Sequence, residues 1–445
     1  MRVSMMIEKN DRRTIFGWCM YDWANSAYVT TVAVALLPAY FAGEIVGPEG
    51  VMIGGTVYSA TTLWGFIVGL AAFLSFLVAP VLGAISDFSA AKKKFLITFA
   101  YTGSLFTLLL YFCHSGDVFK TLLFFFAAQV CFISGNVFYD AFLPQITSED
   151  KMDWVSGKGF AYGYVGGGLQ FAIALGLVAG HAQLGLSQTM AARIGIVMAG
   201  LWWAGFTLFM IKYLSETPSE EPLPDRYREW PTPLAYVGVG ISRTLKTFQH
   251  LGRFRHLVLF LIAYMMYNDG IQTVINMATI YGKEELNLTT TSLMVTLLAI
   301  QAIAIFGALI FSRLAGRINT KRAVMVTLVL WSGVVIYAYF IETTAEYFAL
   351  GVAVGIVLGG SQALSRSLYG SMVPEEASAQ FYGFYTIFSK FSAIWGPLVF
   401  AIIRQVTGTA RLSIISLIIF FILGLVLLYF VDEEKAREAK VAGAF

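Results

Sequence analysis

Charged residues are scarce in this chain. Asp, Glu, Lys and Arg make up 13% of its 445 residues, whereas about 25% is usual in soluble domains. Hydrophobic residues reach 58%, and the mean hydropathy is +0.71. The net charge of +3 does not indicate a nucleic-acid partner, because the basic residues follow the membrane topology described below. This composition excludes an ordinary soluble domain and indicates a protein that lies in a lipid bilayer.

Histidine and cysteine are also rare. The four histidines show no HExxH-type spacing, and no GxxxxGK[ST] phosphate loop is present, which disfavours a metal-dependent enzyme and an ATP-driven pump. Cys19, Cys113 and Cys131 form neither a CxxC pair nor a disulfide framework. We therefore predict a protein that is not an enzyme and carries no metal or cofactor.

Long apolar runs are abundant. A membrane span takes about 20 mostly apolar residues, and continuous runs of this kind favour helices over the alternating strands of a barrel. The first run is too long for a signal-peptide core and is expected to be retained. The predicted fold class is an all-α membrane protein of twelve transmembrane helices, at about 15–43, 56–82, 95–113, 119–146, 158–180, 193–214, 257–281, 289–312, 323–342, 346–372, 380–403 and 412–431.

The chain divides into two sets of six spans. Residues 1–214 are expected to form the first six-helix bundle and 256–432 the second, followed by a tail at 433–445. The proline-rich stretch 215–255 is predicted to be a linker, with an amphipathic helix that lies on the anionic membrane surface or in solvent. With both termini cytoplasmic, the inside segments hold roughly 23 of the 30 Lys and Arg residues.

Four ionisable residues fall inside spans one, four, seven and ten: Asp22, Asp140, Asp269 and Arg366. Such charges are costly in a bilayer, so they usually face a bundle interior or a wet cavity and mark a transport pathway. A buried structural ion pair is the alternative. Asp140 and Arg366 are candidates for a pair between the halves, either static or formed in only one state.

The loop after span two carries a glycine, an acid four residues later and a basic run. These residues are Gly83, Asp87, Lys92, Lys93 and Lys94. Together with the two sets of six helices, this pattern resembles the major facilitator superfamily, in which helices one, four, seven and ten line a central cavity. The resemblance implies that Asp87 meets a neighbouring helix N-terminus and locks the outward-facing state. The loop after span eight keeps the bases but lacks the acid, so a matching lock in the second half is not expected.

Further motifs narrow the resemblance. Span one contains the insert Tyr21-Asp-Trp-Ala-Asn-Ser-Ala-Tyr28, and spans four, five, seven and ten carry Tyr139-Asp-Ala-Phe-Leu-Pro144, Gly163-Tyr-Val-Gly-Gly-Gly168, Tyr267-Asn-Asp-Gly-Ile-Gln-Thr273 and Gly360-Ser-Gln-Ala-Leu-Ser-Arg-Ser367. These segments are similar to those of the vacuole-effluxer-like family, the autophagy-related protein 22-like transporters. The resemblance implies transport of a small solute, and its yeast member is understood to release amino acids from the vacuole.

Helical spacing groups the polar residues into stripes that are expected to face the cavity. An amino acid needs an acceptor for its ammonium group, for which Asp22 or Asp269 is suited, and donors for its carboxylate, for which Arg366 is suited. Interhelical hydrogen bonding is the alternative for these stripes. The candidate residues for substrate binding or coupling are Asp22, Asn25, Tyr28, Asp140, Asn268, Asp269, Gln272, Asn276, Gln362 and Arg366.

Lys390 lies in span eleven, about ten residues from the cytoplasmic face. Its long side chain is expected to snorkel to that face, with contact to substrate as the alternative. Proton coupling needs a carboxylate that can take up a proton, which Asp22, Asp140 and Asp269 can all supply, and sodium is an alternative coupling ion.

The prediction is therefore a secondary transporter that moves an amino acid or similar zwitterion by alternating access, driven by protons. Efflux of amphipathic drugs or metabolites is the alternative within transport, and a non-transporting receptor or scaffold is the alternative from another class. We expect a monomer in the cell (inner) membrane if the protein is bacterial, with the lipid bilayer and a small-molecule substrate as its partners.

Overall fold

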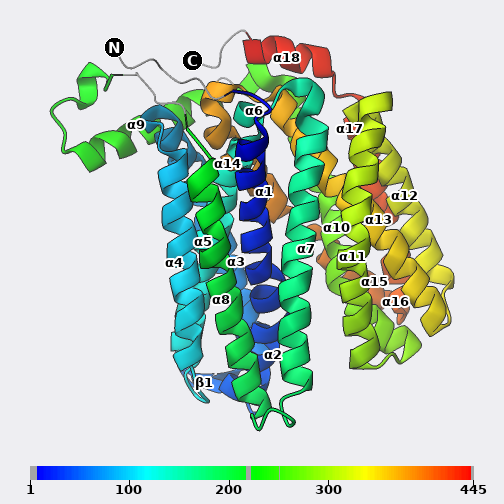
Figure 1. Cartoon of the computed structure of the whole chain (residues 1–445). Helices are drawn as coiled ribbons and strands as arrows, with labels where there is room; N and C mark the ends of the chain where they lie inside the picture. Colours follow the sequence, from blue (N-terminus) through cyan, green and yellow to red (C-terminus); the bar gives the residue numbers. More distant parts are fainter. Residues whose placement is uncertain (1–7, 217–221, 250, 442–445) are drawn as a thin grey trace.

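The computed structural model describes residues 8–216, 222–249 and 251–441, and it is almost entirely helical. Twelve helical segments in these residues are long and apolar enough to cross a membrane, which confirms the predicted number of spans. In Figure 1 most of the first six spans lie on one side and most of the last six on the other, and the described chain begins, at residue 8, and ends, at residue 441, at the same end of the molecule. We call this end the terminal end.

The first half contains α1 (Arg12–Ala27), α2 (Leu37–Tyr40), β1 (Val51–Ile53), β2 (Thr56–Tyr58), α3 (Ala60–Ser89), α4 (Lys92–Leu109), α5 (Val118–Ala141), α6 (Leu143–Ile146), α7 (Met152–Ala179) and α8 (Gln188–Tyr213). The linker contains α9 (Thr232–Gln249). The second half contains α10 (Arg255–Leu286), α11 (Thr290–Ile318), α12 (Thr320–Phe340), α13 (Thr344–Met372), α14 (Ser378–Phe391), α15 (Trp395–Thr407), α16 (Ala410–Ser416), α17 (Ile418–Tyr429) and α18 (Glu433–Val441). Single 3-10 turns and the π-helical continuations of the first span, Tyr28–Leu36 and Phe41–Val46, complete the helical structure.

Several spans begin with a residue whose side chain caps the helix N-terminus. The carboxylate of Asp11 accepts from the backbone N–H of Thr14 at 2.8 Å before α1, and Ser59 and Ser187 cap α3 and α8 in the same way. Thr343 and Glu346 form a reciprocal capping box at the start of α13. These caps satisfy backbone donors that the helix itself leaves unpaired, so each helix has a defined first turn.

A small hairpin interrupts the otherwise helical chain between the first two spans. Strands β1 and β2 pair antiparallel, with Ile53 opposite Thr56. The two residues between them, Gly54 and Gly55, have φ of 57° and 85°, which a two-residue hairpin turn requires and which glycine adopts without steric cost. The all-α prediction holds for the membrane spans and missed this hairpin outside them.

Helix α9 lies at the terminal end, beside α3 (Figure 1). Its buried side includes Ala235, Val239 and Thr247, while an apolar stripe on the other side is exposed, with Ile241 and Leu245 at 45% and 55%. Within the linker, α9 is therefore an amphipathic helix. His250, within the predicted linker, lies outside the described residues.

Candidate functional site

A cavity of about 470 Å³ lies between the two halves, and its walls are mostly apolar and aromatic. Four acidic or basic side chains of the described residues line it: Asp22 and Asp140 from the first half, and Arg366 and Lys390 from the second. Their formal charges sum to zero. The volume is within the range of about 300 to 1,000 Å³ that is usual for small-molecule sites.

The guanidinium of Arg366 joins the two halves. Its Nη1 contacts Asp140 Oδ1 at 3.0 Å and Asp22 Oδ2 at 3.8 Å. Its Nε and Nη2 donate to the hydroxyl and carbonyl oxygens of Ser156 on α7, at 3.1 and 2.9 Å. The side chain is 3% exposed, and its guanidinium lies 4.1 Å from the ring centroid of Phe160. The predicted pair between Asp140 and Arg366 is therefore present. The guanidinium also has hydrogen-bond partners on Ser156 and an aromatic ring against it.

A glycine on α7 makes room for this guanidinium. A Cβ atom at Gly159 would come within 2.9 Å of Arg366 Nη2 and 2.7 Å of Trp18. The larger side chain would displace one of these groups, so Gly159 is required by the close approach of α7 to α1 and α13.

Asp22 is the acid of the cluster with the looser contacts. Its Oδ2 accepts from the hydroxyl of Tyr139 at 3.2 Å, and its Oδ1 accepts from Ser26 at a long 3.4 Å. Its side chain is 13% exposed to the cavity. The cluster of Asp22, Asp140 and Arg366 holds two acids and one base, so it carries one formal negative charge in excess when both acids are ionised.

Several other predicted residues line the cavity with these charges. Asn25 donates to Asn136 at 2.7 Å, and Gln362 accepts from the Tyr164 hydroxyl at 2.6 Å. Asn268, which donates to Ser392, and Gln272 face the cavity from α10. Sequence reasoning missed Asn136, although it precedes Asp140 by four residues and therefore shares its helix face.

Three predicted residues do not line the cavity. Tyr28 is fully buried within the first half and donates to Gln129 at 3.0 Å. Asn276 is exposed on α10 away from the cavity lining. Asp269 is fully buried and accepts from the backbone N–H groups of Trp395 and Gly396 at 3.1 and 2.8 Å. These contacts correct the prediction that each of the three faces the substrate.

The environment of Asp269 follows from a break in span eleven. Helix α14 ends at Phe391 and α15 begins at Trp395, so the first turn of α15 has backbone donors without intrahelical partners. The Asp269 carboxylate caps them. Gly396 permits this contact, because a Cβ atom there would lie 2.8 Å from Asp269 Oδ1.

Lys390 also departs from its prediction. It lies twelve residues after the start of α14 at Ser378, which is about 18 Å along a helix and beyond the reach of a lysine side chain to the terminal end. The side chain lines the cavity instead. The snorkelling prediction is wrong because span eleven turns this position toward the space between the halves.

The cavity is closed toward the terminal end by a first contact between the halves. Asp87 at the end of α3 accepts from the backbone N–H groups of Ala379 and Gln380 at 3.2 and 2.8 Å, at the N-terminus of α14. The ammonium of Lys92 lies 2.7 Å from the same carboxylate, and the two side chains are 5% and 2% exposed. We call this the α3/α14 contact.

The other predicted members of this loop differ in their roles. Gly83 lies directly against α14, since a Cβ atom there would be 2.3 Å from the Ala379 carbonyl oxygen. Lys93 donates to the Ile211 carbonyl at 2.7 Å within the first half, and Lys94 is exposed. Gly83, Asp87 and Lys92 thus build the contact, whereas Lys93 and Lys94 stand beside it.

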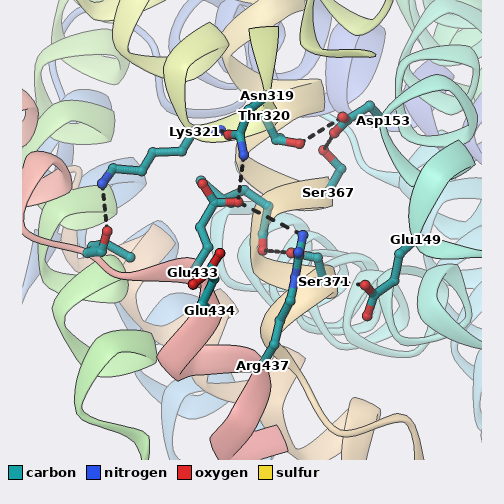
Figure 2. Close-up of polar contacts among 12 residues, drawn as sticks. Glu149, Asp153, Asn319, Thr320, Lys321, Ser367, Ser371, Glu433, Glu434 and Arg437 are labelled. Atoms are coloured by element: carbon teal, nitrogen blue, oxygen red, sulfur yellow. Dashed lines mark hydrogen bonds and ion pairs between the residues drawn. The ribbon is translucent and has the colours of Figure 1, made fainter. Parts of the chain in front are cut away.

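A second contact lies in the equivalent place of the other half, where none was predicted. Asp153 near the start of α7 accepts from the Thr320 hydroxyl at 2.8 Å and from the Ser367 hydroxyl. Figure 2 shows these three side chains pointing toward one another. The acid belongs to α7, and Thr320, the first residue of α12, supplies one of the hydroxyl groups. We call this the α7/α12 contact.

The C-terminal helix adds a bridge beside it. On α18, Lys440 Nζ lies 2.9 Å from Glu149 Oε1 of the first half, and Arg437 lies between Glu149 and Glu433 at 3.7 and 4.0 Å (Figure 2). We call this the Glu149 bridge. Farther from the terminal end, Gln301 of α11 donates to the Thr30 hydroxyl of the first span at 3.5 Å.

Solved structures of major facilitator transporters share this fold. The chain superposes with a TM-score of 0.70 on the transporter FucP in the outward conformation, at 10% identity over 94% of this chain and 98% of that one. The proton:xylose symporter XylE gives 0.68 at 12% identity, over 97% of both chains. These structures share with the chain a fold of two six-helix halves, and in this chain a cavity lies between the halves.

The sequence comparison identifies the class: because a family profile and a full-length relative both match, the chain is a secondary transporter of the major facilitator superfamily, an integral multi-pass membrane protein and not an enzyme. A family profile described as "Vacuole effluxer Atg22 like" matches residues 10–441, and the chain belongs to this family. The MFS-type transporter YxiO of Bacillus subtilis (strain 168) is 35% identical over 424 residues, which cover 95% of each chain. Autophagy-related protein 22 of Kluyveromyces lactis is 24% identical over 98% of this chain and 97% of its own.

Proposed function

We propose that the protein transports an amino acid or a closely similar zwitterion and that proton binding at Asp22 drives transport. The observation that carries the proposal is the Arg366 cluster, in which two acids and one base face the cavity. Its excess negative charge suits a substrate ammonium group. Asp22 is the member whose oxygens have the longer contacts, so it is the acceptor we assign to that group.

Proton coupling follows from the same carboxylate. A proton and a substrate ammonium group are both positive and compete for the same buried carboxylate. Binding of one therefore favours release of the other. Arg366 connects this acid to both halves, so a change in the charge of Asp22 acts on the contacts that join them. Alternating access by relative movement of the two halves is the corresponding transport cycle.

The distribution of basic residues supports cytoplasmic termini. We assign the terminal end to the cytoplasm by the positive-inside rule, with the protein a monomer in the cell membrane. In this orientation the structure is closed to the cytoplasm by the α3/α14 and α7/α12 contacts and extends its cavity toward the outside.

The test begins with ligand binding to the purified protein, since a ligand that binds only the folded state raises the unfolding temperature. The twenty amino acids, organic acids, sugars and lipophilic cations form the panel. Stabilisation by amino acids supports the proposal. Stabilisation by lipophilic cations alone would replace it with efflux of amphipathic compounds, which the largely apolar walls also favour.

The bound amino acid is then followed into proteoliposomes with an imposed proton gradient. We expect Asp22→Asn to abolish gradient-driven accumulation, while Asp225→Asn, at a linker acid whose side chain is 87% exposed, retains it. Asp269→Asn is expected to lower the unfolding temperature instead, because it weakens the cap of α15. Unchanged accumulation in Asp22→Asn would rule out this residue as the coupling site, and a requirement for sodium would reassign the coupling ion.

A further inference from the structure

The two cationic side chains that line the cavity differ in how many of their hydrogen-bond donors already have a partner in the protein. Arg366 uses Nε, Nη1 and Nη2 in contacts with Ser156 and Asp140 and is 3% exposed. Lys390 has no hydrogen bond or ion pair from its Nζ within the residues that the structure describes. An ammonium group has three donors and no acceptor, so Lys390 presents unused donors to the cavity.

The position of Lys390 makes this lack of partners informative. The residue lies near mid-membrane, where a charged side chain costs at least about 2.5 to 3.5 kcal/mol on insertion scales. Charged groups at such depth are normally paired. Lys390 is only half-buried and lines the cavity, so its missing partner has access to it from the same space as the substrate.

Another anion site nearby is already filled. The break in span eleven places the N-terminus of α15 close to Lys390 in sequence, and a helix N-terminus attracts anions. The Asp269 carboxylate accepts from the first N–H groups of that helix, Trp395 and Gly396. Among the described residues that line the cavity, Lys390 is therefore the cation whose charged group has no hydrogen bond or ion pair with the protein.

We infer that Lys390 binds the carboxylate of the substrate and selects carboxylate-bearing ligands. This inference rests on the proposed function, and it replaces the earlier assignment of that role to Arg366. The ammonium group of a zwitterion lies toward Asp22 on α1, and its carboxylate lies toward Lys390 on α14. One small ligand thus contacts both halves, which gives substrate binding a direct way to favour their closure.

The experiment uses a matched set of ligands. We take the amino acid with the largest thermal shift, its decarboxylated amine and its deaminated acid, which for leucine are 3-methylbutylamine and 4-methylpentanoate. Affinities are measured by calorimetry for the wild type, Lys390→Gln and Lys390→Arg. Lys283→Gln, at an exposed lysine near the end of α10, is the charge-matched control.

Loss of a charge-assisted hydrogen bond is expected to weaken amino-acid binding about 10- to 100-fold in Lys390→Gln. Binding of the amine should stay within about threefold of the wild type, which also shows that the variant is folded. Lys390→Arg should recover part of the affinity, and Lys283→Gln should keep all of it.

The outcomes separate the two proposals. If the wild type binds no amino acid, the proposed function fails, and the inference fails with it. If the wild type binds amino acids but Lys390→Gln retains its affinity, or loses amine and amino-acid binding equally, the inference alone is overturned.

Discussion

The α3/α14 and α7/α12 contacts close the same end of the cavity in equivalent places of the two halves, but their chemistry differs. In the first, the carboxylate of Asp87, whose side chain is 2% exposed, binds backbone amides and a buried lysine. In the second, the carboxylate lies on the opposite helix and binds hydroxyl groups, and a bridge of partly exposed ion pairs lies beside it. The difference teaches that pseudo-symmetry preserves the position of a contact more closely than its residues. The difference also predicts that the two contacts contribute unequally to the free energy of unfolding.

Removal of the Asp87 charge is expected to have the largest effect. Asp87→Asn leaves Lys92 buried without its partner, which typically costs about 3 to 5 kcal/mol. Hydrogen exchange measured by mass spectrometry should become faster at Ala379 and Gln380, whose amides Asp87 holds. In the double variant with Lys92→Met the cost should be smaller, because no unpaired charge remains. Unchanged exchange at both amides would show that the contact does not hold α14.

Removal of the Asp153 carboxylate should have an intermediate effect. Asp153→Ala leaves two hydroxyl groups without their acceptor, and each lost hydrogen bond to a charged group contributes about 1.5 to 3 kcal/mol at most. Chemical unfolding of Asp153→Ala, Ser367→Ala and the double variant forms a thermodynamic cycle. We expect a coupling energy of about 0.5 to 1.5 kcal/mol. Additive single effects would mean that the hydrogen bond contributes no stability.

The Glu149 bridge should contribute least. Its side chain is 47% exposed and that of Arg437 is 43% exposed, and exposed ion pairs contribute about 0.2 to 1 kcal/mol. Glu149→Gln should lower the unfolding temperature slightly at low salt. At about 1 M salt, where screening acts within about 3 Å, the difference from the wild type should vanish. A loss as large as that of Asp153→Ala would equate the bridge with the α7/α12 contact.

The α3/α14 contact also predicts a small dependence on pH. Glu216 accepts from the backbone N–H groups of Lys92 and Lys93 at 2.7 and 2.9 Å, and burial raises the pKa of its carboxyl above the ordinary 4.5. The folded state therefore binds the proton more tightly than the unfolded state. The resulting stability is complete below the ordinary pKa and is lost as pH rises through the folded-state pKa.

Glu216→Gln cannot ionise and should lack this dependence. Between about pH 4 and pH 7 the unfolding temperature of the wild type should fall relative to that of the variant. Parallel curves for the two proteins would show that Glu216 has no shifted pKa.

The sequence predicts the fold well because each span is a local pattern that twenty neighbouring residues define. It also predicts the pair of Asp140 and Arg366, since charges inside apolar runs are conspicuous, but it did not predict that Asp22 lies beside this pair. The roles of Asp269 and Lys390 cannot be predicted from their neighbours in the sequence. Both depend on the break between α14 and α15. In the sequence only Gly396 and Pro397 lie near this position, and such a pair is equally typical of a helix that merely bends.

The α7/α12 contact was missed for a related reason. The loop after span eight contains no acid of its own, and the acid that fills this role is Asp153 in the other half of the chain. A pairing between residues 167 positions apart follows from how the helices pack. The spacing of motifs within one loop carries no information about it.

The scarcity of cysteine has a practical consequence. Cys19 and Cys113 are fully buried and Cys131 is 7% exposed, and these three are all the cysteines in the sequence. A water-soluble thiol reagent therefore meets no accessible thiol on the natural chain in this conformation. A single cysteine placed at Val34, a cavity-lining residue that is 64% exposed, would be a lone chemical reporter of whether the cavity is open, with no need to remove any native residue.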